Sequence, residues 1–214
     1  FIGKQLQAIV GEKSIIAINL IDRDNNVLVT RAVIGIEKLL ARIIKIAGKD
    51  PVGVVYDAKD KYLDNLYDGK LHRSENGLYK VLLNTVPKSI CDSIEKLINI
   101  GNIYTIGLTK EKQLFGTVII ILKKGEQDLE NMYVVEAFIK QASMAIQKRY
   151  VENKLRESKD IYRTLVENNY DAVCICKNYT MIFANKKTSE ITGYEQEELL
   201  NINTLDLIHP KDRE

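Results

Sequence analysis

Residues whose side chains commonly do chemistry are scarce in this sequence. It contains three cysteines, Cys91, Cys174 and Cys176, and two histidines, His72 and His209. An odd, sparse set of cysteines does not form a disulfide framework, and free thiols fit a reducing compartment. The histidines are isolated, and we expect Cys174 and Cys176 to point to opposite faces of a strand, which does not suit one metal ion. The sequence therefore predicts no metal site, and no cofactor is evident.

Cys91 is the one candidate for a reactive thiol. It lies in the motif SICDS, near the start of a predicted helix. A partly exposed thiol at a helix N-terminus can have a lowered pKa and react as a thiolate. The alternative is that Cys91 is a small buried core residue.

No catalytic set is visible in the rest of the chain. There is no Gly-rich phosphate loop followed by Lys-Ser or Lys-Thr. Ser, His and Asp residues can be combined only by choosing distant positions at will. We therefore expect no enzyme activity from residues 1–214.

Charge and hydropathy exclude two classes of partner. The 31 basic and 29 acidic residues give a net charge of +2, without the basic excess of a nucleic-acid-binding protein. The longest apolar run, around Val118–Leu122, is far shorter than the roughly 20 residues of a membrane span. We expect a cytoplasmic chain without nucleic-acid or membrane contacts. Because the chain begins at Phe1, we expect it to be part of a longer protein, which could be membrane-attached through other segments.

Hydrophobic periodicity predicts an α+β fold, in which an antiparallel sheet lies between helices. The segment GKLHRSENG (69–77) is predicted as a loop, and a second, shorter α+β unit with two strands follows near residue 155. The predicted strands of the first unit are Ser14–Ile21, Val27–Val33, Val52–Tyr56, Ile103–Leu108 and Leu114–Leu122, and its main predicted helices are 1–13, Ile34–Ala47, Lys88–Ile98 and a long helical pattern from Glu126 to Asn169.

The C-terminal sequence carries a specific family resemblance. The segments YRTLVENNYDAV, IFANKKTSEITGY and EELL…LIHPKDRE (within 161–214) together resemble the first half of a PAS domain. Asn185 can cap the helix that follows it, and Gly193 suits the end of that helix. The resemblance implies a truncated PAS-like unit over residues 159–214.

The N-terminal part resembles a GAF domain through the order of its elements. The segment IYTIGLTKEKQLFGTVIIIL resembles the last two strands of a GAF sheet, and VEAFIKQASMAIQKRYVENKL resembles its closing helix. The resemblance implies a GAF-like sensor domain over residues 1–150 and a linker helix over 126–165. Aromatic and polar residues in its irregular part and in the strands beside it are our candidates for lining a ligand cavity, the alternative being ordinary core and surface positions. They are Tyr56, Tyr62, Tyr67, His72, Arg73, Tyr79 and Tyr104.

The long helix contains a weak heptad pattern. Seven residues three and four apart form a seam that includes two polar positions, Lys148 and Ser158, of which Lys148 is charged. A helix packed on its own domain explains this pattern, and so does a parallel homodimer that carries a signal between domains. The apolar seam residues are Met144, Val151, Leu155, Tyr162 and Leu165.

The order GAF, helix, PAS is that of sensor histidine kinases of archaeal or bacterial two-component systems. The resemblance implies a sensory fragment that detects a small molecule, a redox change or a partner, and relays it through the linker helix to a phosphorelay. The alternatives are the sensor of a transcription regulator or of a cyclic-dinucleotide enzyme, and a dimerisation module without a ligand.

Overall fold

The computed structural model describes residues 2–75, 77–126, 128–129, 131–200, 202–209 and 211. Asn76 of the predicted loop and the end of the PAS-like motif, Pro210 and 212–214, lie outside these residues. The chain divides into an N-terminal unit, Phe1–Arg149, and a C-terminal unit, Tyr150–Glu214. Each unit is described by itself.

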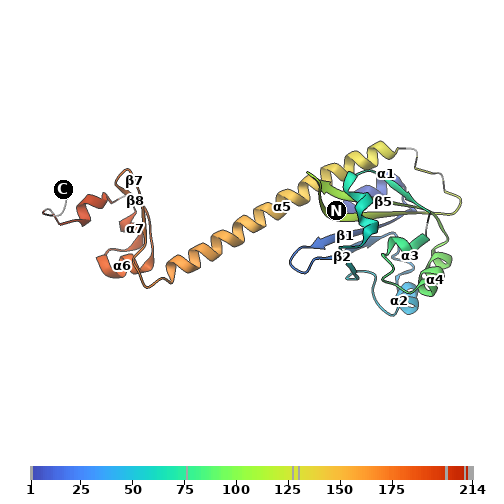
Figure 1. Cartoon of the computed structure of the whole chain (residues 1–214), viewed down its shortest axis with the longest axis horizontal. Coiled ribbons are helices and arrows are strands. Elements are labelled where there is room, and N and C mark those ends of the chain that lie inside the picture. Colours follow the sequence, from blue (N-terminus) through green and yellow to red (C-terminus); the bar gives the residue numbers. More distant parts are fainter. Residues whose placement is uncertain are drawn as a thin grey trace. The chain divides into compact units, whose positions relative to one another are not determined.

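A six-stranded antiparallel sheet organises the N-terminal unit (Figure 1). The strand order is β3-β2-β1-β6-β5-β4, and the central strands alternate β-branched residues toward both faces, as a sheet covered on both sides requires. The bounds are β1 Ile15–Asp22, β2 Val27–Ile34, β3 Val55–Asp57, β4 His72–Ser74, β5 Ile100–Lys110 and β6 Gln113–Lys123.

Helices cover the two faces of this sheet (Figure 1). Helices α1 (Ile2–Val10) and the first part of α5 (Met132–Glu167) pack on one face through a core around Ile106, Val118 and Ile139. On the other face, α2, α3 and α4 enclose a second core around Ile94, Ile119 and Ile121. These helices are α2 Leu40–Ala47, α3 Gly77–Val81 and α4 Lys88–Ile98, and a 3-10 helix, η1, spans Lys61–Asp68.

A helix beginning at Ile34 was predicted wrongly. Strand β2 continues to Ile34, and Gly35 then adopts φ +87°, a left-handed conformation that interrupts any regular element. Helix α2 starts only at Leu40. The prediction of a loop over GKLHRSENG was also wrong in part, because His72–Ser74 pairs with β5 as the edge strand β4.

The C-terminal unit is a hairpin followed by short helices. Strand β7 (Cys174–Lys177) pairs antiparallel with β8 (Thr180–Ala184). Helices α6 (Lys186–Thr192) and α7 (Gln196–Leu199) and the 3-10 helix η2 (Thr204–Leu207) follow. A small core joins Met181, Ala184 and Leu199. The α+β fold class predicted from the sequence is thus confirmed for both units.

Among the described residues, no helix has both the length and the apolar character to cross a membrane.

Candidate functional site

An apolar cavity lies inside the N-terminal unit, between the sheet and the helices α2 to α4. Its volume is about 100 Å³, and its walls include Ile15, Ile43 and Ile119. The polar side chains of Asn19, Thr30 and Tyr56 border the same cavity, as does Lys49. A mostly apolar pocket with a few placed polar groups is the usual form of a small-molecule site.

The register of three strands builds the polar border. Asn19 on β1 lies directly opposite Thr30 on β2 and opposite Thr117 on β6. The pairing of β1 with β2 shifts between Ile18 and Asn19, and such a bulge re-aims side chains. The result is a buried polar row, Thr30–Asn19–Thr117, across three strands.

The hydrogen bonds of this row leave the Tyr56 hydroxyl oxygen able to accept one more hydrogen bond. Asn19 Nδ2 donates to Thr117 Oγ1 at 3.0 Å. Thr30 Oγ1 lies 2.8 Å from Asn19 Oδ1 and 3.2 Å from the Tyr56 hydroxyl oxygen. Because Asn19 Oδ1 can only accept, the single Thr30 proton goes to it, and the Tyr56 hydroxyl donates to Thr30. Burial raises the pKa of Tyr56, so its hydroxyl stays neutral and its oxygen can still accept a hydrogen bond.

The structure does not bring the seven predicted cavity residues together. Only Tyr56 borders the apolar cavity. Tyr62, His72 and Arg73 line a separate polar cleft of about 250 Å³, in which the Tyr62 hydroxyl lies 3.3 Å from Thr105 Oγ1. The other three lie elsewhere: Tyr67 in a surface groove beside α5, Tyr79 against the core under α3 and α4, and Tyr104 on the opposite face of the sheet.

Tyr104 belongs instead to a polar cluster near the start of α5. Its hydroxyl donates to Asp128, which also accepts from Asn102 Nδ2 at 3.1 Å. Arg73 donates to Asn102 Oδ1 at 2.7 Å. Burial first, and then the hydrogen bond to Asp128, raise the pKa of Tyr104 to about 12. The same hydrogen bond lowers the pKa of Asp128. The cluster fastens the segment before α5 to strands β4 and β5.

Cys91 occupies the position of a core residue. It lies in the first turns of α4, as predicted, but its side chain is 0 % exposed. Burial, and then the nearby carboxylates of Glu95 and Asp92, raise its pKa. A buried thiol with a raised pKa is inert, so the structure favours the core reading. Among the described residues, no group of three or more His, Cys, Asp or Glu side chains is arranged to hold a metal ion.

Helix α5 carries the predicted seam on its surface. Its first part is anchored, because Val135, Ile139 and Ala142 are buried against the sheet. All five apolar seam residues are exposed by 45 % or more: Met144, Val151, Leu155, Tyr162 and Leu165. The seam is therefore not used for packing within the described chain.

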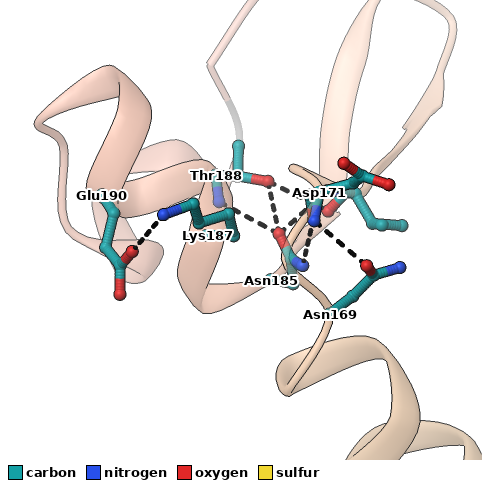
Figure 2. Close-up of polar contacts among 7 residues, drawn as sticks. Asn169, Asp171, Asn185, Lys187, Thr188 and Glu190 are labelled. Carbon is teal, nitrogen blue, oxygen red and sulfur yellow. Dashed lines mark hydrogen bonds and ion pairs between the residues drawn. The ribbon is translucent and has the colours of Figure 1, made fainter.

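Figure 2 shows Asn185 bonded to Thr188 and Asp171, and the same side chain also contacts the last turn of α5. The Asn185 side chain is fully buried, and its Nδ2 donates to the carbonyls of Val166 at 2.9 Å and Asp171 at 3.0 Å. Its Oδ1 accepts from the amide of Val173 at 2.9 Å and from the amide and hydroxyl of Thr188 at 3.0 and 2.7 Å. The predicted capping of α6 by Asn185 is confirmed, as is the left-handed end of that helix at Gly193.

Glu167, at the end of α5, adds a second fastening. Its carboxylate accepts from the backbone amide of Lys186 at 3.0 Å and from Gln196 Nε2 at 3.2 Å. Gln196 Nε2 also lies 3.0 Å from the carbonyl of Ala184, to which it donates. The end of α5 thus contacts α6 and α7 through directed hydrogen bonds, and α7 in turn is bonded to β8.

Residues 160–214 match the family model of the PAS fold. We refer to this matched segment as the PAS unit. The two strands of the PAS unit, its Asn-capped helix α6 and the turns after Gly193 are the elements on which the sequence resemblance depends. A comparison with curated proteins gave no match for the chain.

The N-terminal unit has a GAF-like fold. The structure of a GAF domain/HD domain protein from Geobacter sulfurreducens aligns with a TM-score of 0.50 and 14% identity, over 70% of this chain and 90% of that one. The PixJ GAF domain of Thermosynechococcus elongatus gives 0.49 and 12%, over 73% and 87%. The GAF domain of a two-component sensor histidine kinase from Bacillus halodurans gives 0.48 and 12%, over 71% and 95%. At 14% identity, the likeness to the Geobacter sulfurreducens protein shows the fold alone.

Sequence reasoning missed the polar row of the cavity. Asn19 stands in the otherwise apolar run IIAINLI, on the same strand face as Ile15 and Ala17. A buried polar residue in a core strand needs partners, and that signal was visible in the sequence. Its partners Thr30 and Thr117 depend on the sheet register, which the sequence does not show.

Proposed function

We infer that this chain is the sensory part of a signal-transduction protein, in which the GAF-like unit binds a small molecule and α5 relays its presence. The apolar cavity with its buried polar row carries this proposal. Polar side chains in the core are costly unless satisfied, and Asn19, Thr30 and Tyr56 border the cavity. A ligand site explains both features together.

The size of the cavity limits the ligand. Pockets for drug-sized ligands occupy about 300–1,000 Å³, and an engineered apolar cavity of about 150 Å³ holds benzene. At about 100 Å³, the cavity fits a molecule of a few heavy atoms, such as a short branched alcohol. Its apolar part would contact Ile43 and Ile119, and a hydroxyl would donate to Tyr56. Nucleotides and tetrapyrroles are too large for it.

The route of the signal follows from where the elements meet. Strand β6 presents Ile119 and Ile121 to the cavity side and Val118 and Ile120 to the α5 side. A ligand that favours one arrangement of the sheet would shift the population of α5 positions on the opposite face. Asn185 and Glu167 would then carry the displacement of α5 into the PAS unit.

We further propose that α5 forms a homodimer and that the output is the phosphorelay of a cytoplasmic sensor histidine kinase. The five exposed seam residues of α5 support the dimer, because a parallel pair of helices would bury them. The order GAF, helix, PAS supports the kinase output. The chain itself is proposed to bind and relay, without catalysis of its own.

The direct test is to purify the chain and record its absorption and native mass spectra. We expect a bound mass that is lost in Ala17→Ile, whose added atoms occupy the cavity, and retained in Ala41→Ile, which lies exposed on α2. A resident chromophore would add a visible band. If all three proteins are colourless and carry no added mass, and none binds small alcohols, the sensor proposal fails and the dimerisation module gains.

A further inference from the structure

The C-terminal unit carries a pair of thiols that the cavity proposal does not use. Cys174 and Cys176 both lie on β7, and both are exposed in the structure. The prediction that they point to opposite faces was wrong, because residues two apart on a strand share a face. The pairing with β8 shifts between Ile175 and Cys176, so that Cys174 lies opposite Ala184 and Cys176 opposite Met181. A side-chain hydrogen bond between Cys174 and Cys176 shows that the two thiols are in contact. The two thiols therefore lie side by side on an exposed strand.

The spacing of the two residues allows a disulfide, with strain. Two residues of strand advance the chain by about 6.6 Å. That distance lies at the upper end of the roughly 4.4–6.8 Å between Cα atoms joined by a disulfide. Closing the ring would shorten β7 between Cys174 and Cys176. Strained and exposed disulfides are readily reduced, as a reversible regulatory bond must be.

We propose that Cys174 and Cys176 form a redox-sensitive dithiol that a peroxide converts to an intramolecular disulfide. One thiolate attacks a peroxide oxygen, the O–O bond breaks, and a sulfenic acid and one water (or alcohol) form. The second thiol attacks the sulfenic sulfur, the S–S bond forms, the S–O bond breaks, and water leaves. Two thiols are oxidised by two electrons, and the peroxide is reduced by two electrons.

The position of the pair gives the disulfide a consequence. Val173, immediately before Cys174, donates its amide to Asn185 Oδ1, and Asn185 in turn holds the end of α5. Shortening β7 would pull on this hydrogen bond. The dithiol is thus a second input, acting on the same junction as α5 but independent of the cavity.

The reaction should depend on pH in a defined direction. Burial and the neighbouring Cys174 thiol raise the pKa of Cys176. Because the thiolate is the reactive form, oxidation through Cys176 should accelerate with pH, by about tenfold per unit while that thiol is mostly protonated. The groups that face the pair from β8 are the apolar side chains of Met181 and Ala184, so no charged group on that strand opposes this trend.

The test is peroxide treatment of the whole chain in a Cys91→Ala background, followed by intact-mass and peptide analysis. Both thiols lie in one tryptic peptide, residues 164–177, so an internal disulfide shows as a loss of two hydrogens from that peptide. We expect this loss at low peroxide, its reversal by dithiothreitol, and a slower reaction at lower pH. Cys174→Ser and Cys176→Ser should instead accumulate oxygen adducts or disulfide-linked dimers.

Two outcomes overturn the proposal. One is that the two-thiol protein gains oxygen at the same rate as the single-thiol variants, without losing two hydrogens. The other is that it forms only disulfides between chains. Either result leaves the cavity proposal untouched, because the Cys-to-Ser variants retain every residue that lines the cavity.

Discussion

Removing the Asn185 side chain should release the end of α5 from the PAS unit. Asn185→Ala deletes an acceptor and a donor that together make five hydrogen bonds in a fully buried position. Loss of the helix cap costs about 1 kcal/mol. Stranding the amide of Val173 and the carbonyl of Val166 adds about 1 kcal/mol or more each. The expected destabilisation of the PAS unit is therefore about 3 kcal/mol.

Hydrogen exchange measures this effect at a site that Asn185 does not touch. The amide of Met181 donates to the carbonyl of Ile202, so its exchange reports opening of the whole unit. A loss of about 3 kcal/mol corresponds to roughly a hundredfold faster exchange. The matched control is Asn169→Ala, which removes one exposed hydrogen bond and should change exchange by less than about fivefold.

An acidic variant separates the two roles of the side chain. Asn185→Asp keeps an acceptor for the cap, which a negative charge favours at a helix N-terminus. It removes the donation to Val166 and places a carboxylate near that carbonyl. We expect α6 to stay formed while the end of α5 frays. If Asn185→Ala and Asn169→Ala accelerate the exchange of Met181 equally, the hydrogen bonds of Asn185 do not hold the end of α5.

Three further predictions test other parts of the structure. The ultraviolet titration of Tyr104 should have its midpoint near pH 12, and Asp128→Asn should lower it toward 10. Because the folded pKa is raised, this tyrosine contributes stability that is present below about pH 10 and lost as the pH rises through 12; an unchanged midpoint in Asp128→Asn would contradict the cluster. Cys91 should not react with Ellman's reagent until the protein unfolds, because its side chain is buried. Rapid labelling of Cys91 in the native protein would contradict this burial. Cysteines introduced separately at Leu155 and Tyr162 should cross-link into dimers, and failure at both positions would refute the parallel seam.

The sequence predicted elements well where local chemistry determines them. The β-branched runs gave β1, β2, β5 and β6, and the four-residue apolar spacing gave α4 with its observed bounds. The cap at Asn185 was predictable because its partners are neighbours in sequence.

Features that depend on distant pairing were missed for a physical reason. Strand β4 is three residues of polar character at a sheet edge, with no alternation to reveal it. The late start of α2 follows from the conformation of Gly35, which the apolar spacing of Ile36 and Leu39 conceals. The seven predicted ligand residues were chosen by type and by position in or beside an irregular segment. Which face of the sheet each occupies is set by the register, so they were dispersed over several sites.

The sensor account is tested most directly by methyl NMR of the isoleucines during titration with isobutanol, a probe with one hydroxyl and a small apolar body. We predict saturable shifts confined to cavity residues such as Ile15, Ile43 and Ile119, together with smaller shifts of Ile139 in α5 across the sheet. Both sets should vanish in Ala17→Ile and persist in Ala41→Ile. Shifts that are unsaturable, or equal in the two variants, would contradict a ligand site in this cavity.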